Sequence, residues 1–225
     1  MEKYLPILES CPLFSTMTSN EILSVMNCIK GRIIRKDENE FILRVGEATR
    51  EMGLVLSGST LIIQEDIWAH RNIMSKCIPG DFFGETYAAT AGSVLNISVI
   101  ANEKCEILMI SLDEILNGCA NQCSHHHRLI KNLVYVLANK ILILNSKITH
   151  MSKRTTRDKL LSYLSSEAIK QGKLSFNIPY DRQQLADFLC VERAAMSVEL
   201  SKLQKEGYFT TKKKHFELRG SIVDV

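Results

Sequence analysis

The chain has 225 residues, of which 45% are hydrophobic and 24% charged, which is ordinary for a globular protein with two modest domains. No apolar run approaches the ~20 residues that cross a bilayer. The N-terminus carries Glu2 and Glu9 and has no long apolar core, so we expect neither a membrane span nor a secretory signal. These features predict a cytoplasmic protein.

The charge is unevenly distributed, although the formal net charge is only +3. Residues 151–225 contain 14 Lys and Arg against nine Asp and Glu, a balance of +5, whereas residues 1–150 have a balance of −2. A basic C-terminal third favours contact with a polyanion. A solvated basic face gives the same pattern, so charge alone does not decide between them.

The seven cysteines do not indicate a disulfide framework. Their number is odd and no CxxC spacing occurs, so we expect reduced thiols.

The N-terminal half predicts a helix followed by an all-β region. Thr18 and Glu21 fit a capping box, and the apolar residues from Ile22 to Ile29 recur at helical spacing. From residue 31 to residue 111, apolar runs of strand length are separated by Gly, Asn, Asp and Pro. That alternation is typical of a β-barrel or β-sandwich.

A capping box at Ser111–Glu114 predicts a short helix that begins near Leu112. A long helix is then predicted from about residue 122 to residue 151. Apolar residues repeat along it in two columns over three heptads. The columns consist of Ile130, Val134, Leu137, Ile141, Leu144 and Ile148. A seam of this length favours a parallel homodimeric coiled coil, and the alternative is a helix packed on its own domain.

The C-terminal third predicts a helix-turn-helix. Residues 152–156 are polar and indicate a hinge, and the helix that follows ends near Gly172. Asp181 is placed to cap a helix that runs to about Leu189, and after a short break a second helix covers residues 193–206. Two short helices joined by a tight turn form the helix-turn-helix pattern, whose second helix has dimensions that fit the DNA major groove.

A basic hairpin follows these helices. Two alternating runs flank residues 212–215, and lysines at the tip of such a wing contact phosphates. On the second helix, Arg193 is placed to take a guanine edge in bidentate fashion, with a surface ion pair as the alternative. The predicted DNA-binding residues are Arg182, Gln183, Arg193, Ala194, Ser197, Lys202, Lys212, Lys213 and Lys214.

Over nearly its whole length the chain resembles the Crp/Fnr family of bacterial transcription factors, the cyclic-AMP receptor protein and its relatives. The segments that carry the resemblance are Leu13-Phe14, VLSG (55–58), PGDFFGE (79–85), ISVIA (97–101), the long helix, and DRQQLADFL (181–189) with VERAAMSVELSKLQKEGYF (191–209). The resemblance implies an α+β fold. It comprises an N-terminal cyclic-nucleotide-binding-type β-roll sensor in residues 1–120, a long dimerisation helix in 121–151, and a winged helix-turn-helix DNA-binding domain in 152–225.

The sensor departs from the cyclic-nucleotide binders of this family, in which a GEL…RSA cassette holds the ligand. Gly84 and Glu85 remain, but the Arg-Ser positions that take the cyclic phosphate read Leu95-Asn96. A buried phosphate without a partner would cost several kcal/mol, so we expect an unidentified effector that is not cyclic AMP. On the long helix, the Thr-Ser pair of the cyclic-AMP branch aligns, without a gap, with two apolar residues. The predicted pocket consists of Phe83, Gly84, Glu85, Thr86, Leu95, Asn96, Ile97, Leu142 and Ile143.

The second helix of the helix-turn-helix, which is the recognition helix in this family, also departs from the family's pattern. Arg193 matches the family's arginine, but Ala194 stands where a Glu is frequent and Val198 stands where a later Arg is frequent. We therefore expect an operator of its own.

No metal or cofactor is predicted. An Fnr-type iron–sulfur cluster needs more than the two N-terminal cysteines, and no secure haem ligand is found. Cys119, Cys123, His126 and His127 could approach one metal on a single helix, but their spacing matches no known zinc module. The alternative is a helix start with buried Cys and exposed His.

We predict a homodimeric, non-enzymatic transcription regulator that binds an inverted-repeat operator and is controlled allosterically through the β-roll. RNA polymerase is a further candidate partner. A redox-, metal- or haem-responsive regulator of the same fold is the first alternative. A cupin-type metalloenzyme lacks ligands, because His70 is the only histidine between residues 31 and 111. A nucleotide-gated module that regulates a partner protein is a further alternative, and the complete winged helix argues against it.

Overall fold

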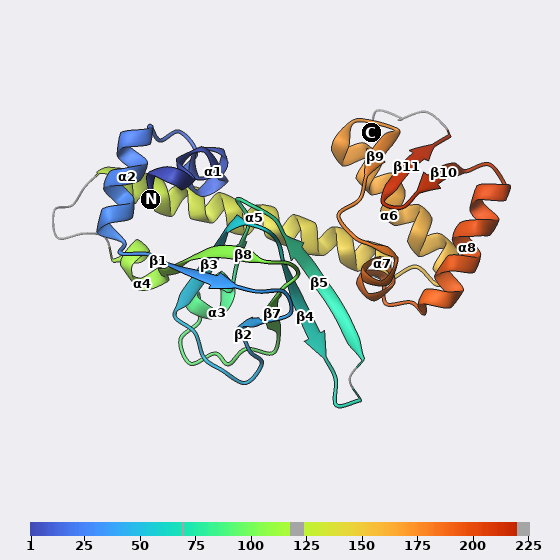
Figure 1. The fold of residues 1–225 in the computed structure, drawn as a ribbon, viewed down its shortest axis with the longest axis horizontal. Coiled ribbons are helices and arrows are strands. Elements are labelled where there is room, and N and C mark those ends of the chain that lie inside the picture. Colours follow the sequence, from blue (N-terminus) through green and yellow to red (C-terminus); the bar gives the residue numbers. More distant parts are fainter. Residues whose placement is uncertain (69, 118–123, 220–225) are drawn as a thin grey trace. The chain divides into compact units, whose positions relative to one another are not determined.

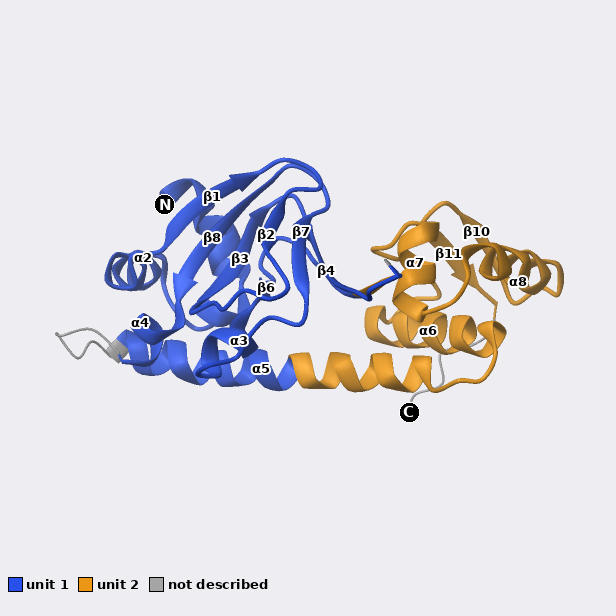
Figure 2. Ribbon diagram, turned by 90° about the horizontal axis from the view of Figure 1, so that it is seen from below, with its two compact units in different colours: residues 1–70, 74–139 blue, residues 71–73, 140–225 orange. Residues whose placement is uncertain are grey.

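The computed structural model describes residues 1–68, 70–117 and 124–219. They form two compact units (Figure 2). The first comprises residues 1–70 and 74–139, and the second comprises residues 71–73 and 140–225. The division falls inside the long helix, which was expected to form a segment of its own.

The first unit is built on two antiparallel sheets, which confirms the predicted β-roll (Figure 1). The strand orders are β1-β8-β3-β6 and β2-β7-β4-β5. The strands are β1 (Arg32–Lys36), β2 (Phe41–Leu43), β3 (Glu51–Ser57), β4 (Thr60–Glu65), β5 (Arg71–Cys77), β6 (Phe82–Phe83), β7 (Ser98–Ala101) and β8 (Cys105–Ser111). The apolar residues of both sheets meet in a closed interior, which explains why the runs of residues 31–111 are so rich in Val, Ile, Leu and Phe.

Short helices surround the sheets: α1 (Leu5–Ser10), α2 (Ser19–Cys28), α3 (Glu85–Ala89) and α4 (Leu112–Leu116). Thr18 and Glu21 form the predicted capping box at the start of α2, with both reciprocal hydrogen bonds present. At α4 the helix begins at Leu112 as expected, but the Ser111 side chain makes no capping hydrogen bond.

The long helix α5 (Ser124–Met151) uses one of its faces within the first unit. Leu129, Leu133 and Val136 are buried in the core formed by α1, α2 and β8. Two residues of the predicted seam, Ile130 and Leu137, also pack partly against this core. Both are only half-buried, so their place in an intermolecular seam stays a prediction.

The second unit contains α6 (Thr156–Gln171), α7 (Arg182–Leu189), α8 (Arg193–Lys205) and the strands β9 (Ser175–Asn177), β10 (Phe209–Lys212) and β11 (His215–Leu218). The strands form an antiparallel sheet in the order β10-β11-β9. The hairpin β10–β11 matches the predicted wing, whereas β9 was not predicted. Gly172 ends α6 in the left-handed conformation, as predicted.

Candidate nucleic-acid interface

Local contacts fix the two helices of the helix-turn-helix. Asp181 and Gln184 form a complete capping box at the start of α7. Cys190 then adopts the left-handed conformation with φ 51°, which ends α7 and allows α8 to begin three residues later. Lys159 of α6 donates to the carbonyl oxygens of Leu189 and Cys190 at 3.3 and 3.4 Å. A cation at this place stabilises α7, because the C-terminal end of a helix carries partial negative charge.

The recognition helix α8 is held against the body of the second unit. Met196, Leu200 and Leu203 are buried in the core. At the C-terminal end of α8, Arg157 of α6 forms a bidentate ion pair with Glu206, and its guanidinium lies 5.2 Å from the centroid of the Tyr208 ring. These contacts leave the opposite face of α8 free.

Arg182 has a different environment from the other predicted DNA contacts. Its guanidinium is half-buried, lies 5.0 Å from the Phe216 ring centroid and donates from Nη2 to Thr211 Oγ1 at 2.9 Å. The other terminal nitrogen, Nη1, is buried and has no hydrogen-bond partner among the described residues. Burial lowers the pKa of Arg182. The structure thus places Arg182 as a link between α7 and the wing.

The three wing lysines are exposed around the β10–β11 turn. Lys213 adopts φ 56°, and Lys214 donates from Nζ to the Pro179 carbonyl oxygen at 3.4 Å. The carbonyl oxygen of Lys214 also accepts from the amide of Ile178 at 2.9 Å. The wing tip is therefore tied to the loop that precedes α7.

Four predicted DNA contacts surround one hollow of about 390 Å³ at the junction of α7 and α8. They are Gln183, Arg193, Ala194 and Ser197. Asp187 and Glu192, which were not among the predicted site residues, line the same hollow. Gln183 donates to Asp187 at 2.8 Å, and burial raises the pKa of Asp187. A carboxylate here can accept a hydrogen bond from cytosine N4 but repels phosphate.

A second hollow, of about 490 Å³, lies beside α8 and was also missed. It is lined by Thr155, Thr156 and Arg157 at the start of α6 and by Ala195, Val198 and Glu199. The side-chain oxygen of Thr155 caps α6, whose N-terminus favours anions. Lys202, a predicted contact, is ion-paired with Glu199 at 2.8 Å.

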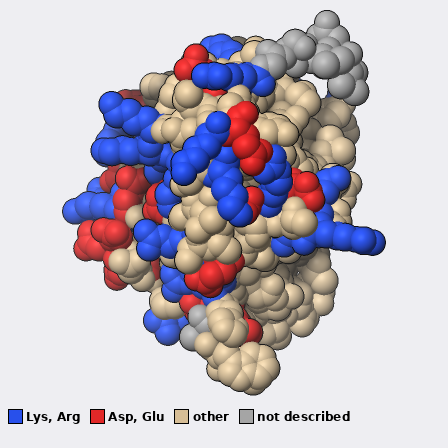
Figure 3. Space-filling model, turned by 90° about the vertical axis from the view of Figure 1, so that its right-hand side faces the viewer, with Lys and Arg blue, Asp and Glu red and all other residues tan. Residues whose placement is uncertain are grey.

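Basic side chains dominate this end of the second unit. The view towards α8 shows Lys and Arg side chains gathered there, with Asp and Glu among them (Figure 3). The exposed basic residues include Lys153, Arg154, Arg193, Lys202, Lys205, Lys212, Lys213 and Lys214. Such a surface attracts the phosphate backbone of DNA.

The predicted effector residues fall in two places. Phe83, Gly84 and Glu85 are buried where β6 meets α3, and Gly84 takes φ 81°. Leu95 and Ile97 are buried in the interior of the β-roll, whereas Thr86 and Asn96 are exposed. The Tyr87 hydroxyl donates to the Asn96 side chain. Leu142 and Ile143 belong to the second unit and are exposed.

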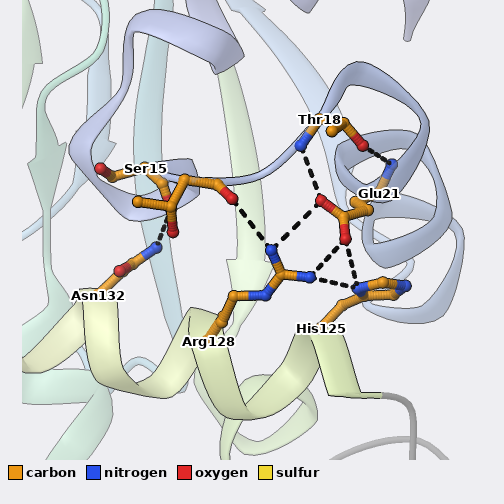
Figure 4. Close-up of polar contacts among 7 residues, drawn as sticks. Ser15, Thr18, Glu21, His125, Arg128 and Asn132 are labelled. Carbon is orange, nitrogen blue, oxygen red and sulfur yellow. Dashed lines mark hydrogen bonds and ion pairs between the residues drawn. The ribbon is translucent and has the colours of Figure 1, made fainter.

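A polar cluster joins the N-terminal segment to α5 (Figure 4). Arg128 forms an ion pair with Glu21 and donates to the Thr16 carbonyl oxygen at 3.0 Å. This ion pair and the capping hydrogen bonds lower the pKa of Glu21 to about 2. The Asn132 amide donates to the carbonyl oxygens of Leu13 and Ser15, each at 2.9 Å.

The candidate metal ligands His126 and His127 lie next to His125, which takes part in the same cluster. His125 Nδ1 lies 3.4 Å from Glu21 Oε1. Of the histidines proposed as ligands, His126 is buried and His127 is exposed. Cys119 and Cys123 lie outside the described residues.

Two family models match the chain in order along the sequence. The cyclic nucleotide-binding domain matches residues 34–122, and the Crp-like helix-turn-helix domain matches residues 158–219. The chain belongs to the Crp/Fnr family. It is therefore a Crp-like DNA-binding transcription regulator with an effector-binding domain, and not an enzyme, which excludes the cupin-type alternative.

Solved Crp/Fnr structures have the same fold. The c-di-GMP responsive global regulator CLP of Xanthomonas campestris has a TM-score of 0.71 and 18% identity, with 91% of this chain and 100% of that chain covered. A CooA variant from Carboxydothermus hydrogenoformans has a TM-score of 0.70 and 17% identity, with coverages of 96% and 91%. FixK2 of Bradyrhizobium japonicum has a TM-score of 0.64 and 14% identity, with coverages of 84% and 93%. No curated protein matches the chain in sequence.

Proposed function

We propose that this Crp/Fnr regulator acts as a homodimer, binds an inverted-repeat operator through α8 and the wing, and responds to an effector other than cyclic AMP. The observation that carries the proposal is the apolar face of α5, which would remain in water in a monomer. DNA binding through two α8 helices requires a two-fold partner, and α5 supplies the surface for it.

Four seam residues are exposed on α5. Val134, Ile141, Leu144 and Ile148 are 60%, 58%, 45% and 63% exposed. Leu142 and Ile143 are exposed beside them. Contiguous apolar patches of this kind mark interaction sites, and a second copy of the same helix buries them at heptad spacing.

A membrane span is the rival explanation for these residues. By length and composition alone, His125–Met151 could cross a bilayer. Lys131, Lys140 and Lys147 are spread along that helix, however, and each charge is costly at the centre of a bilayer. Val134, Ile141 and Ile148 recur every seven residues along the helix, a spacing that suits a partner helix better than lipid.

The dimer is tested by sedimentation of matched variants. Ile148→Glu places a charge in the proposed seam, and Ile169→Glu places the same charge on α6, where Ile169 is 55% exposed. We expect the first variant to sediment as a monomer and the second to remain dimeric. Dimers of unchanged stability in Ile148→Glu would refute the seam.

The operator is tested by selection from a random duplex pool, with and without cell extract as a source of effector. We expect an enriched palindrome whose half-sites each contain a guanine read by Arg193, which is exposed at the start of α8. Arg193→Ala should lose about tenfold or more in preference at that guanine while non-specific binding changes little. A pool without an enriched palindrome would contradict the proposal.

The effector site is proposed in the β-roll around Phe83, Gly84, Glu85, Thr86, Leu95, Asn96 and Ile97. Leu95, which aligns with the phosphate-binding Arg of the family's cyclic-nucleotide binders, is buried, and the Asn96 amide is engaged by Tyr87. No cation is therefore offered to a phosphate at these two positions. Titration calorimetry with cyclic AMP should give no heat above dilution, and native mass spectrometry of the purified protein would show a retained effector. Saturable binding of cyclic AMP would refute this part.

A further inference from the structure

The outer face of α8 is defined by its buried face. Met196, Leu200 and Leu203 point into the core. At 100° per residue, the positions opposite them are Ala194, Val198, Ser201 and Lys205. All four are exposed, and Val198 is 54% exposed. Val198, which also lines the hollow beside the start of α6, therefore lies near the centre of the exposed face of α8.

The polar side chains around Val198 have few donors to offer to a base. The Ser197 hydroxyl donates to the Arg193 carbonyl oxygen at 2.9 Å, and the Ser201 hydroxyl donates to the Ser197 carbonyl oxygen at 3.0 Å. Lys202 is engaged by Glu199. Arg193 remains as the donor at the start of the helix, and the exposed face presents the alkyl groups of Ala194 at the second helical position and Val198 near the middle.

Only one base carries an alkyl group in the major groove, namely thymine with its C5-methyl. We propose that Val198, with Ala194 beside it, reads a thymine methyl in each operator half-site. This inference rests on the proposed function, because it requires that α8 enters the major groove. Arg193 and Val198 are five residues apart, which is about 7.5 Å along the helix axis and roughly two base pairs of DNA. The thymine should thus lie about two base pairs from the guanine that Arg193 reads.

Val198 would thus read a base at a position where Crp/Fnr relatives frequently carry an arginine. Cytosine, guanine and adenine present only hydrogen-bonding groups and ring C–H at their major-groove edges, and Val198 has no polar atom to pair with them. A base pair without the methyl would leave donors or acceptors facing the valine side chain without water or partner.

The test uses the full-length protein and the palindrome enriched from the random pool. Each thymine of the half-site is replaced in turn by deoxyuridine, which removes the methyl and keeps every hydrogen-bonding group. We expect one position, about two base pairs from the guanine, to weaken binding about fourfold in one half-site and about fifteenfold in both.

The variant Val198→Ala links that effect to the side chain. It should bind thymine and deoxyuridine operators within twofold of each other, because the shorter side chain no longer reaches the methyl. Alanine has the higher helix propensity, so α8 is retained. Ile169→Ala, which truncates an exposed aliphatic residue on α6, is the matched control and should keep the full discrimination.

The outcomes separate this inference from the proposed function. If a palindrome is enriched and Arg193→Ala relaxes it, but no deoxyuridine weakens binding, the regulator stands and the thymine reading is overturned. A deoxyuridine effect that persists undiminished in Val198→Ala also overturns it, because another residue then reads the methyl. If no palindrome is enriched, the proposed function fails and this inference fails with it.

Discussion

Gly53 of β3 lies opposite Phe83 of β6, and its missing side chain makes room for the Phe83 ring. A Cβ at position 53 would lie 2.1 Å from Phe83 Cζ and 2.4 Å from Cε2. Phe83 is fully buried in the β-roll interior with Leu95 and Ile97, so the ring has no solvent into which it can move. The substitution Gly53→Ala therefore forces the core to shift.

The cost follows from this overlap. Overpacking a core by one methyl typically costs about 1–3 kcal/mol, and we expect about 3 kcal/mol because the contact is with a rigid ring. Phe83→Ala should cost about 3–5 kcal/mol by leaving a cavity. In that background the new methyl occupies vacant space, so Gly53→Ala should cost less than about 0.5 kcal/mol. The double-mutant cycle should thus give a coupling of about 2–3 kcal/mol.

Urea titration with hydrogen exchange measured on peptides from β3 and β8 reports the opening of the first unit separately from the second. Gly92→Ala is the control, because Gly92 has φ 74° but no atom within 4 Å of its Cβ position. It should cost about 1–2 kcal/mol for backbone strain alone. An equal cost of Gly53→Ala with and without Phe83 would refute the steric argument.

Three further predictions concern charge. Because the pKa of Glu21 is lowered to about 2, its stabilising effect is complete above its ordinary pKa of 4.5 and is lost as the pH falls towards about 2. Arg128→Met should therefore flatten the acid limb of a plot of urea midpoint against pH. An unchanged limb would contradict this. Burial lowers the pKa of His150 below 6.5, and its ring nitrogens lie 2.8 and 3.1 Å from the hydroxyls of Ser162 and Ser146. The unfolded chain then binds the proton more readily, so stability should fall as the pH drops below 6.5, and His150→Asn should remove that part of the pH dependence of the melting temperature. Lys213→Gln should lower the slope of log affinity against log salt by about 0.9 per half-site with unchanged sequence preference. An unchanged slope would exclude a phosphate contact at that position.

The features that were predictable from sequence are the ones that depend on neighbours in the chain. Thr18 with Glu21 and Asp181 with Gln184 form capping boxes because cap and partner are three residues apart, a spacing visible in the sequence. The strands of the β-roll were visible for the same reason, since apolar runs and turn residues alternate locally.

Features that depend on distant segments were not predictable. The heptad pattern of α5 is the same whether the partner is a second copy or the helix's own domain, so the pattern did not indicate that Ile130 and Leu137 also pack partly against the first unit. Arg182 precedes Phe216 by 34 positions, and nothing in the sequence indicates that its guanidinium stacks on that ring. The hollow beside α8 was not predicted, because its lining residues come from the start of α6 and from α8, which are far apart in the sequence and meet only in the folded second unit.

The link that Arg182 makes between α7 and the wing has a consequence for the entropy of association. The guanidinium on Phe216, the hydrogen bond to Thr211 and the contact of Lys214 with Pro179 order the wing before any ligand arrives. Binding to a pre-organised surface avoids the loss of freedom that a flexible hairpin would suffer. Arg182→Met should therefore slow productive docking and speed dissociation, even though the side chain itself need not touch DNA.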